Sequence, residues 1–178
     1  VNKPRGIVRT EERRERDSIV RFLNYPVRIT YVGRLDKDSE GLLLMTNNGD
    51  IINRMMRAAN KHEKEYKVTV DKPVTDEFLK EMAGGVPILD TLTRPCQVEK
   101  LGKYKFKIIL TQGLNRQIRR MCEALGYEVK ELRRVRIMNI ELGNLKPGEY
   151  RKVTDQELNE LYELIRDSKS EPTPWNNN

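Results

Sequence analysis

The chain has 178 residues, a formal net charge of +7 and a sequence pI of about 9.4, which suits one domain with a hydrophobic core and a polyanionic partner. No apolar run approaches the length of a membrane span and no secretory signal is present, which argues against a membrane or secreted protein. Cys96 and Cys122 are too far apart for a Cys-x-x-Cys pair, and His62 is the only histidine, so we expect free thiols, a cytoplasmic protein and no multi-histidine metal site.

The positive charge is concentrated in one part of the sequence. Residues 113–136 contain seven basic and three acidic side chains, whereas residues 149–167 contain three basic and six acidic ones. This separation favours an oriented nucleic-acid face over a generally basic surface.

The first third of the chain reads as strands and short helices around one charged loop. A strand is predicted at residues 6–8, a helix after Asp17, a strand at 29–32 and a buried strand at 42–46. Between the last two strands lies the loop 33–41, which begins and ends with glycine. Asp50 is then expected to cap a helix that runs to residue 59.

The middle of the chain shows clearer periodicity. Residues 65–70 alternate, which places Tyr66 on the apolar face of a strand. A helix is predicted from Thr75 to a stop at residues 84–85, followed by a hairpin of strands at 95–100 and 104–111.

A helix over residues 116–125, capped by Asn115, has a buried stripe at i, i+3, i+4 and i+7. Arg119 lies at the flank of this stripe, so it can turn inward. Arg116 and Arg120 lie on the opposite side, where a solvated helix face explains them equally well.

The last elements complete an α+β chain. Residues 129–142 are strand-like, and Thr154 with Glu157 forms a capping box for a final helix. We expect one domain over residues 1–166, with a mixed, largely antiparallel central sheet flanked by helices, and a disordered tail over residues 167–178.

The charged loop 33–41 has three carboxylates, and its ordinary interpretation is a solvated turn. Asp36, Asp38 and Glu40 imitate the first half of an EF-hand loop, but Asn47 stands where the bidentate glutamate is required, which argues against calcium. A second catalytic carboxylate at Asp38 or Glu40, as in a glycosidase, is another interpretation.

Three stretches in the same order resemble the RsuA-type ribosomal RNA pseudouridine synthases. They are Gly33-Arg34-Leu35-Asp36 with Asp38-Ser39-Glu40-Gly41-Leu42-Leu43, then Glu63-Lys64-Glu65-Tyr66, and Gly113-Leu114-Asn115-Arg116-Gln117-Ile118-Arg119-Arg120-Met121. Leu114, where the family often has arginine, and Met138, where it often has glycine, are similar to the RluF subgroup, which acts on large-subunit ribosomal RNA.

The resemblance implies the pseudouridine synthase fold and the isomerisation of uridine to pseudouridine without metal or cofactor. Asp36 matches the catalytic aspartate, and whether it attacks the sugar, attacks the base or first removes a sugar proton stays open. Arg119 matches the arginine that pairs with this aspartate. Tyr66 matches the tyrosine that packs on the target ring and takes a proton late in the reaction, and Leu132 resembles the apolar residue on the other side of the pocket.

The implied partner is ribosomal RNA, in particular a stem-loop of 23S RNA, bound by a monomer. Arg34 is placed to fill the space left by a flipped base, and further contacts are expected from the following residues: Lys3, Asn115, Arg116, Arg120 and Arg134. The S4 module that usually precedes the catalytic domain is not in the sequence, so we expect a fragment of a longer protein. The alternative is a non-catalytic RNA-binding or ribosome-assembly protein with the same fold.

Overall fold

The structure is a computed structural model that describes residues 1–6, 23, 25, 29–33, 35–58 and 61–166. The helix predicted after Asp17, most of the strand predicted at 6–8, Arg34 and the predicted tail lie outside these residues. Gly6 itself is in a turn after a short strand at the start of the chain.

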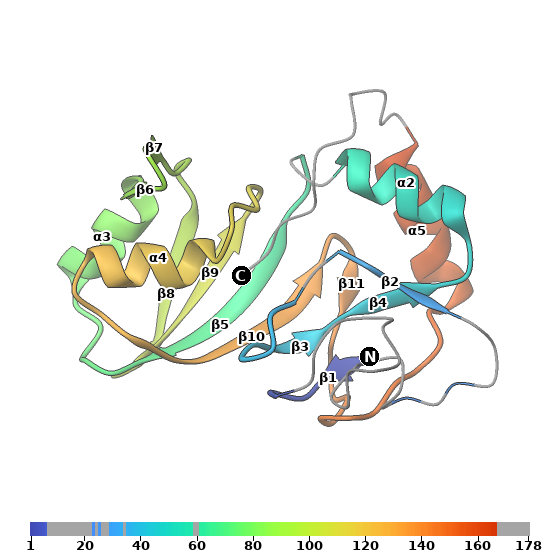
Figure 1. Cartoon of the computed structure of the whole chain (residues 1–178), viewed down its shortest axis with the longest axis horizontal. Coiled ribbons are helices and arrows are strands. Elements are labelled where there is room, and N and C mark those ends of the chain that lie inside the picture. Colours follow the sequence, from blue (N-terminus) through green and yellow to red (C-terminus); the bar gives the residue numbers. More distant parts are fainter. Residues whose placement is uncertain (7–22, 24, 26–28, 34, 59–60, 167–178) are drawn as a thin grey trace.

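A seven-stranded sheet extends through the molecule between two groups of helices (Figure 1). Its path is β1-β3-β10-β5-β9-β8, with β11 paired to β10. The strands are β1 (Asn2–Lys3), β3 (Glu40–Leu42), β5 (Lys64–Val70), β8 (Gln97–Gly102), β9 (Lys105–Leu110), β10 (Val129–Ile137) and β11 (Ile140–Glu141). The β3–β10 pair is parallel and the other pairs of this sheet are antiparallel, so the predicted α+β class with a mixed, largely antiparallel sheet is confirmed.

Helices and two small two-stranded sheets lie at the two ends of this sheet. At one end lie α3 (Asp76–Gly84), α4 (Gln117–Ala124) and the pair β6 (Pro87–Ile88) and β7 (Thr91–Leu92). At the other end lie α2 (Gly49–Ala58), α5 (Asp155–Ile165) and the pair β2 (Thr30–Val32) and β4 (Leu44–Thr46). The strands β3, β10 and β5 cross the space between these two groups (Figure 1).

The hydrophobic residues divide in the same way. One cluster packs α3 and α4 against the sheet and includes Phe78, Phe106 and Met121. A second cluster joins α2 and α5 and includes Met55 and Leu161. A third, small cluster contains Leu35 and Leu43.

Several local predictions are confirmed. The β8–β9 hairpin forms with Phe106, Ile108 and Leu110 buried on one face. Thr75 caps α3 by accepting from the Phe78 amide at 3.0 Å, and Thr154 makes the complete capping box on α5. Both cysteines are free.

Three boundaries differ from the prediction. The apolar run at 42–46 is not one strand, because its first half pairs in the large sheet and its second half, β4, pairs with β2. Asn48, not Asp50, caps α2, since its Oδ1 accepts from the Asp50 amide at 3.0 Å. The stretch 129–142 folds back as a hairpin, with Met138 at φ 55 in the turn.

Gly41 allows β3 to pack closely against β10. Its φ is +112, and a Cβ at this position would overlap the Arg134 carbonyl oxygen and lie 2.6 Å from the Arg134 nitrogen. Only glycine lets β3 lie this close to β10. The loop that ends at Gly41 is thereby fixed against the central strand.

Candidate active site

Asp36 lies in a loop that is anchored on both sides by buried leucines. Leu35 and Leu43, 1% and 0% exposed, pack into one small cluster beneath the loop. The Ser39 amide donates to the Asp36 carbonyl at 3.0 Å, which closes a tight turn. The two leucines of the loop are therefore buried, whereas the Asp36 carboxylate stays partly exposed.

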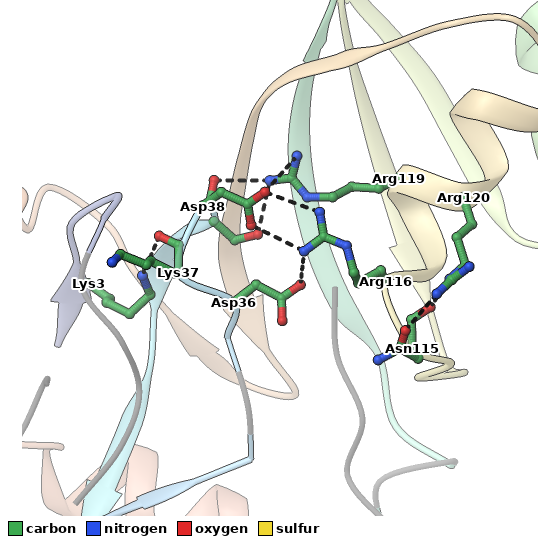
Figure 2. A network of polar contacts seen from close by, with 9 residues as sticks. Lys3, Asp36, Lys37, Asp38, Asn115, Arg116, Arg119 and Arg120 are labelled. Atoms are coloured by element: carbon green, nitrogen blue, oxygen red, sulfur yellow. Dashed lines mark hydrogen bonds and ion pairs between the residues drawn. The ribbon is translucent and has the colours of Figure 1, made fainter. Parts of the chain in front are cut away.

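Arg116 reaches across from the start of α4 and contacts two carboxylates of this loop (Figure 2). Its Nη1 lies 3.1 Å from Asp36 Oδ2 and 3.3 Å from Asp38 Oδ1, and its Nη2 lies 3.1 Å from Asp38 Oδ2. Arg116 has φ 48 immediately before the helix, which is the left-handed region. Its side chain therefore leaves α4 towards the loop and not along the solvated helix face.

Arg119 is buried, 7% exposed, as its flank position predicted, but its partner differs from the prediction. It contacts Asp38 through a 3.6 Å ion pair and a 3.0 Å hydrogen bond to the Asp38 carbonyl, and it donates to Ser39 Oγ at 3.2 Å. The direct ion pair to Asp36 is made by Arg116, which immediately precedes α4. The charge of Asp36 still acts on Arg119 through space.

Asp38 is the residue whose role the sequence interpretation missed. Burial raises the pKa of its carboxyl, but the Arg116 hydrogen bond and the charges of Arg119 and Arg116 outweigh burial and hold that pKa below its usual value. Asp38 thereby fastens both arginines beside Asp36. The sequence holds no signal for this pairing, because the loop and α4 are far apart in the chain and only the fold brings them together.

Lys3 does not lie where a phosphate could reach it. Its side chain is fully buried, and Nζ donates to the carbonyls of Pro4 at 3.0 Å and Lys37 at 3.4 Å (Figure 2). Burial lowers the pKa of Lys3 to about 8, opposed by the carboxylates of Asp36, Asp38 and Glu40. The prediction of an outer RNA contact is wrong for Lys3, because its side chain is buried and its ammonium group is bonded to backbone carbonyls.

Tyr66 lies on the buried face of β5, 1% exposed, opposite Arg134 on β10. Leu132 is the next buried residue along β10 and belongs to the same hydrophobic cluster as Tyr66. Arg134 is also fully buried, so the prediction that it contacts RNA is wrong. It extends beneath the site because alternate residues of β10 point into the core.

Asn115 and Arg120 form the outer edge of the site. Arg120 donates to the Asn115 carbonyl at 2.9 Å and to its Oδ1 at 3.0 Å (Figure 2). Asn115 does not cap α4, because Arg116 occupies the position before the helix and makes no side-chain cap. Asn115 is exposed and Arg120 is half-exposed, so both can meet a ligand.

The arrangement supplies a carboxylate among fixed cations. The charge of Asp36 acts on Lys3, Arg116, Arg119 and Arg134, and also on the Tyr66 hydroxyl. Surrounding cations stabilise the ionised form of a carboxylate, which is the nucleophilic form. Within the described ranges, His, Cys, Asp and Glu side chains form no group of three that could hold a metal, and no helix is long and apolar enough to cross a membrane.

Comparisons with known proteins show the family of this chain. A family model described as RNA pseudouridylate synthase matches residues 1–124. The dual-specificity RNA pseudouridine synthase RluF of Shigella flexneri is 58% identical over 174 residues, which cover 98% of this chain and 60% of that protein. The ribosomal small subunit pseudouridine synthase A of Yersinia pestis is 36% identical over 89% of this chain and 69% of that protein.

Among solved structures, a crystal structure of a pseudouridylate synthase superposes with a TM-score of 0.81 at 34% sequence identity. The match covers 90% of this chain and 71% of that one. The chain thus spans about 60% of the length of RluF and most of a second, solved relative.

Proposed function

Since this chain belongs to the family of RNA pseudouridylate synthases, we propose that it isomerises uridine to pseudouridine in RNA, with Asp36 as the catalytic residue. The observation that carries the proposal is the Asp36 carboxylate, held 3.1 Å from the Arg116 guanidinium and within electrostatic range of the buried Tyr66 hydroxyl. In the reaction the bond from the sugar to N1 of uracil breaks and a bond from the sugar to C5 forms. The hydrogen on C5 is lost and N1 gains one, so the product is an isomer.

Asp36 acts as the nucleophile that holds one fragment while the uracil turns. Its side chain is 26% exposed, so it is open to substrate yet backed by the core. Arg116 pairs with Asp36, and Asp38 holds the Arg116 and Arg119 guanidiniums in place.

Tyr66 and Leu132 form the apolar side of the uracil site. A base within a duplex is inaccessible, so the target uridine is flipped out of the stack or taken from a loop. Asn115 and Arg120 at the outer edge contact phosphates, which position RNA without reading its sequence, and Arg34 fills the space left by the flipped base.

We propose large-subunit ribosomal RNA as the substrate, in the form of a stem-loop that a monomer of this chain binds in the bacterial cytoplasm. The support is the 58% identity to RluF, whose name describes a dual-specificity RNA enzyme. The alternative is an RNA-binding protein without activity, and the ionic contacts of Asp36 argue against it because a binding protein has no need to hold a carboxylate at an RNA surface.

The test is to incubate the chain with bulk ribosomal RNA and to map pseudouridine at single-nucleotide resolution. Asp36→Asn keeps the shape of the side chain but loses its nucleophilicity, and Asp50→Asn, an exposed aspartate on α2, is the matched control. Conversion by wild type and by the control, but not by Asp36→Asn, is expected. Binding of RNA by wild type without conversion would establish the non-catalytic alternative.

A further inference from the structure

Arg134 is fully buried beneath the candidate site, which is unusual for an arginine. It lies on β10 directly opposite Tyr66 on β5, and both side chains are buried on the same face of the sheet. The charge of the guanidinium acts on the Tyr66 hydroxyl.

The same residue is bonded to the strand that leaves the Asp36 loop. Arg134 Nε donates to the Leu42 carbonyl at 2.9 Å, and its backbone lies against Gly41. Asp36 acts electrostatically on the guanidinium as well. One side chain therefore connects the Asp36 loop with Tyr66, which come from separate motifs of the sequence.

We infer that Arg134 is a positioning residue that fixes the Tyr66 hydroxyl and stabilises negative charge on it during proton transfer with the bound uracil. The inference rests on the proposed function. A guanidinium stays charged at any working pH, so it can stabilise a phenolate without itself giving up a proton. The phenol gives its proton to N1 of the released uracil, and the phenolate takes the proton lost from C5 after the new bond has formed, so the residue is unchanged at the end.

The charged groups around Tyr66 come from several elements. Arg134 on β10 favours the phenolate form of Tyr66, whereas Asp36 on the loop opposes it. Burial has the largest effect and raises the pKa of Tyr66 above its usual value. Lys3 on β1 and Lys64 on β5 lie within electrostatic range of Arg134. Burial lowers the pKa of Lys64 to about 7, so Arg134 is the member of this group whose charge does not change near neutral pH.

Arg136 on the same strand offers a matched control. It is partly buried and bonded to Glu63 at 3.2 Å and Glu65 at 3.3 Å, on the part of β10 that lies beyond Tyr66. Loss of this arginine removes a strand cation without touching the Tyr66 hydroxyl. Any effect shared by Arg134→Gln and Arg136→Gln is therefore structural.

The experiment measures RNA affinity and single-turnover rates at saturating protein for wild type, Arg134→Gln, Arg134→Lys and Arg136→Gln. Arg134→Gln is expected to lower the rate about 100-fold with little change in affinity, as for a misplaced catalytic group. Arg134→Lys, which keeps the charge, is expected to recover part of this rate, and Arg136→Gln to behave as wild type. In a Tyr66→Phe background Arg134→Gln is expected to add no further loss.

A second measurement does not depend on activity. A fluorinated tyrosine at position 66, titrated by fluorine NMR, is expected to show a higher phenol pKa in Arg134→Gln than in wild type, with Arg134→Lys between them. If Arg134→Gln fails to fold, the comparison of Arg134→Lys with wild type still decides, since lysine keeps the charge but loses the planar fork.

Equal rates in wild type and the Arg134 variants, or full additivity with Tyr66→Phe, would overturn the role of Arg134 while leaving the proposed function intact. An inactive wild type would overturn both. An unchanged phenol pKa in folded Arg134→Gln would overturn the inference by itself.

Discussion

Replacing Gly41 by alanine should separate β3 from β10 and displace the Asp36 loop. The added methyl group would overlap the Arg134 carbonyl oxygen and lie 2.6 Å and 3.0 Å from the Arg134 nitrogen and carbonyl carbon. These are backbone atoms of the central strand, which cannot rotate away as a side chain does. The φ of +112 adds strain for any residue with a Cβ.

Overpacking of a dense core costs about 1–3 kcal/mol and an unfavourable backbone conformation about 1–3 kcal/mol, so Gly41→Ala should lose about 2–6 kcal/mol of unfolding free energy. Gly143→Ala is the control, because Gly143 has φ 59 but no atom within 4 Å of its Cβ position. It should lose only the backbone part, roughly 1–2 kcal/mol.

Urea unfolding followed by circular dichroism measures both values, and the difference between the two variants isolates the steric contact. Thermal unfolding should shift by roughly 2–4 °C per kcal/mol for a domain of this size. Equal stability of Gly41→Ala and Gly143→Ala would refute the close packing of β3 on β10. Normal turnover by Gly41→Ala would refute the claim that this packing positions Asp36.

Three further predictions test the site and the fold. Arg116→Ala should slow turnover more than it weakens RNA binding, because Arg116 contacts Asp36 directly. Arg119→Lys should lose the contact to Ser39, and its single-turnover rate should depend more steeply on pH. Unchanged rates and pH–rate profiles in both variants would contradict a role of these arginines in catalysis. Tyr66→Phe should keep ring packing and slow proton transfer. Tyr66→Leu should also lose base stacking worth roughly 1–3 kcal/mol. RNA affinity measures the loss of stacking, and the single-turnover rate measures the loss of proton transfer. Glu157→Gln should make the free energy of unfolding less sensitive to acid. The Arg151 hydrogen bond lowers the pKa of Glu157 from 4.5 to about 2 in the folded chain, so the stabilisation by Glu157 is present above pH 4.5 and is lost as the pH falls to 2. Acid unfolding curves that coincide for the variant and wild type would contradict this prediction.

The sequence predicted those parts of the fold that depend on local chemistry. The Thr75 cap, the Thr154 capping box and the β8–β9 hairpin each need only a few adjacent residues, and all three are confirmed. The split of the run at 42–46 was not predictable, because Leu42 and Leu44 are equally apolar and only their distant partners differ.

The burial of Arg119 was predicted from the sequence, but the ion pairs of the site were not. Helical periodicity placed Arg119 inward, and it is buried, yet periodicity says nothing of which carboxylate it meets across the molecule. The left-handed conformation of Arg116 turned a residue assigned to the solvated face towards Asp36. Lys3 and Arg134 are basic, which favours the prediction of RNA contacts. Both side chains are buried, and burial is the less common outcome for a basic residue.

The parallel pairing of β3 with β10 has a consequence for the order of folding. Arg133 hydrogen-bonds Glu40 across 93 positions of the sequence, so the neighbour that shapes the Asp36 loop is synthesised long after the loop itself. Pairings of such separation form late, since chain closure must precede the contact. A nascent chain therefore carries Asp36 in an unfinished loop, and this loop reaches its final arrangement only when residues 129–137 have emerged and paired with β3.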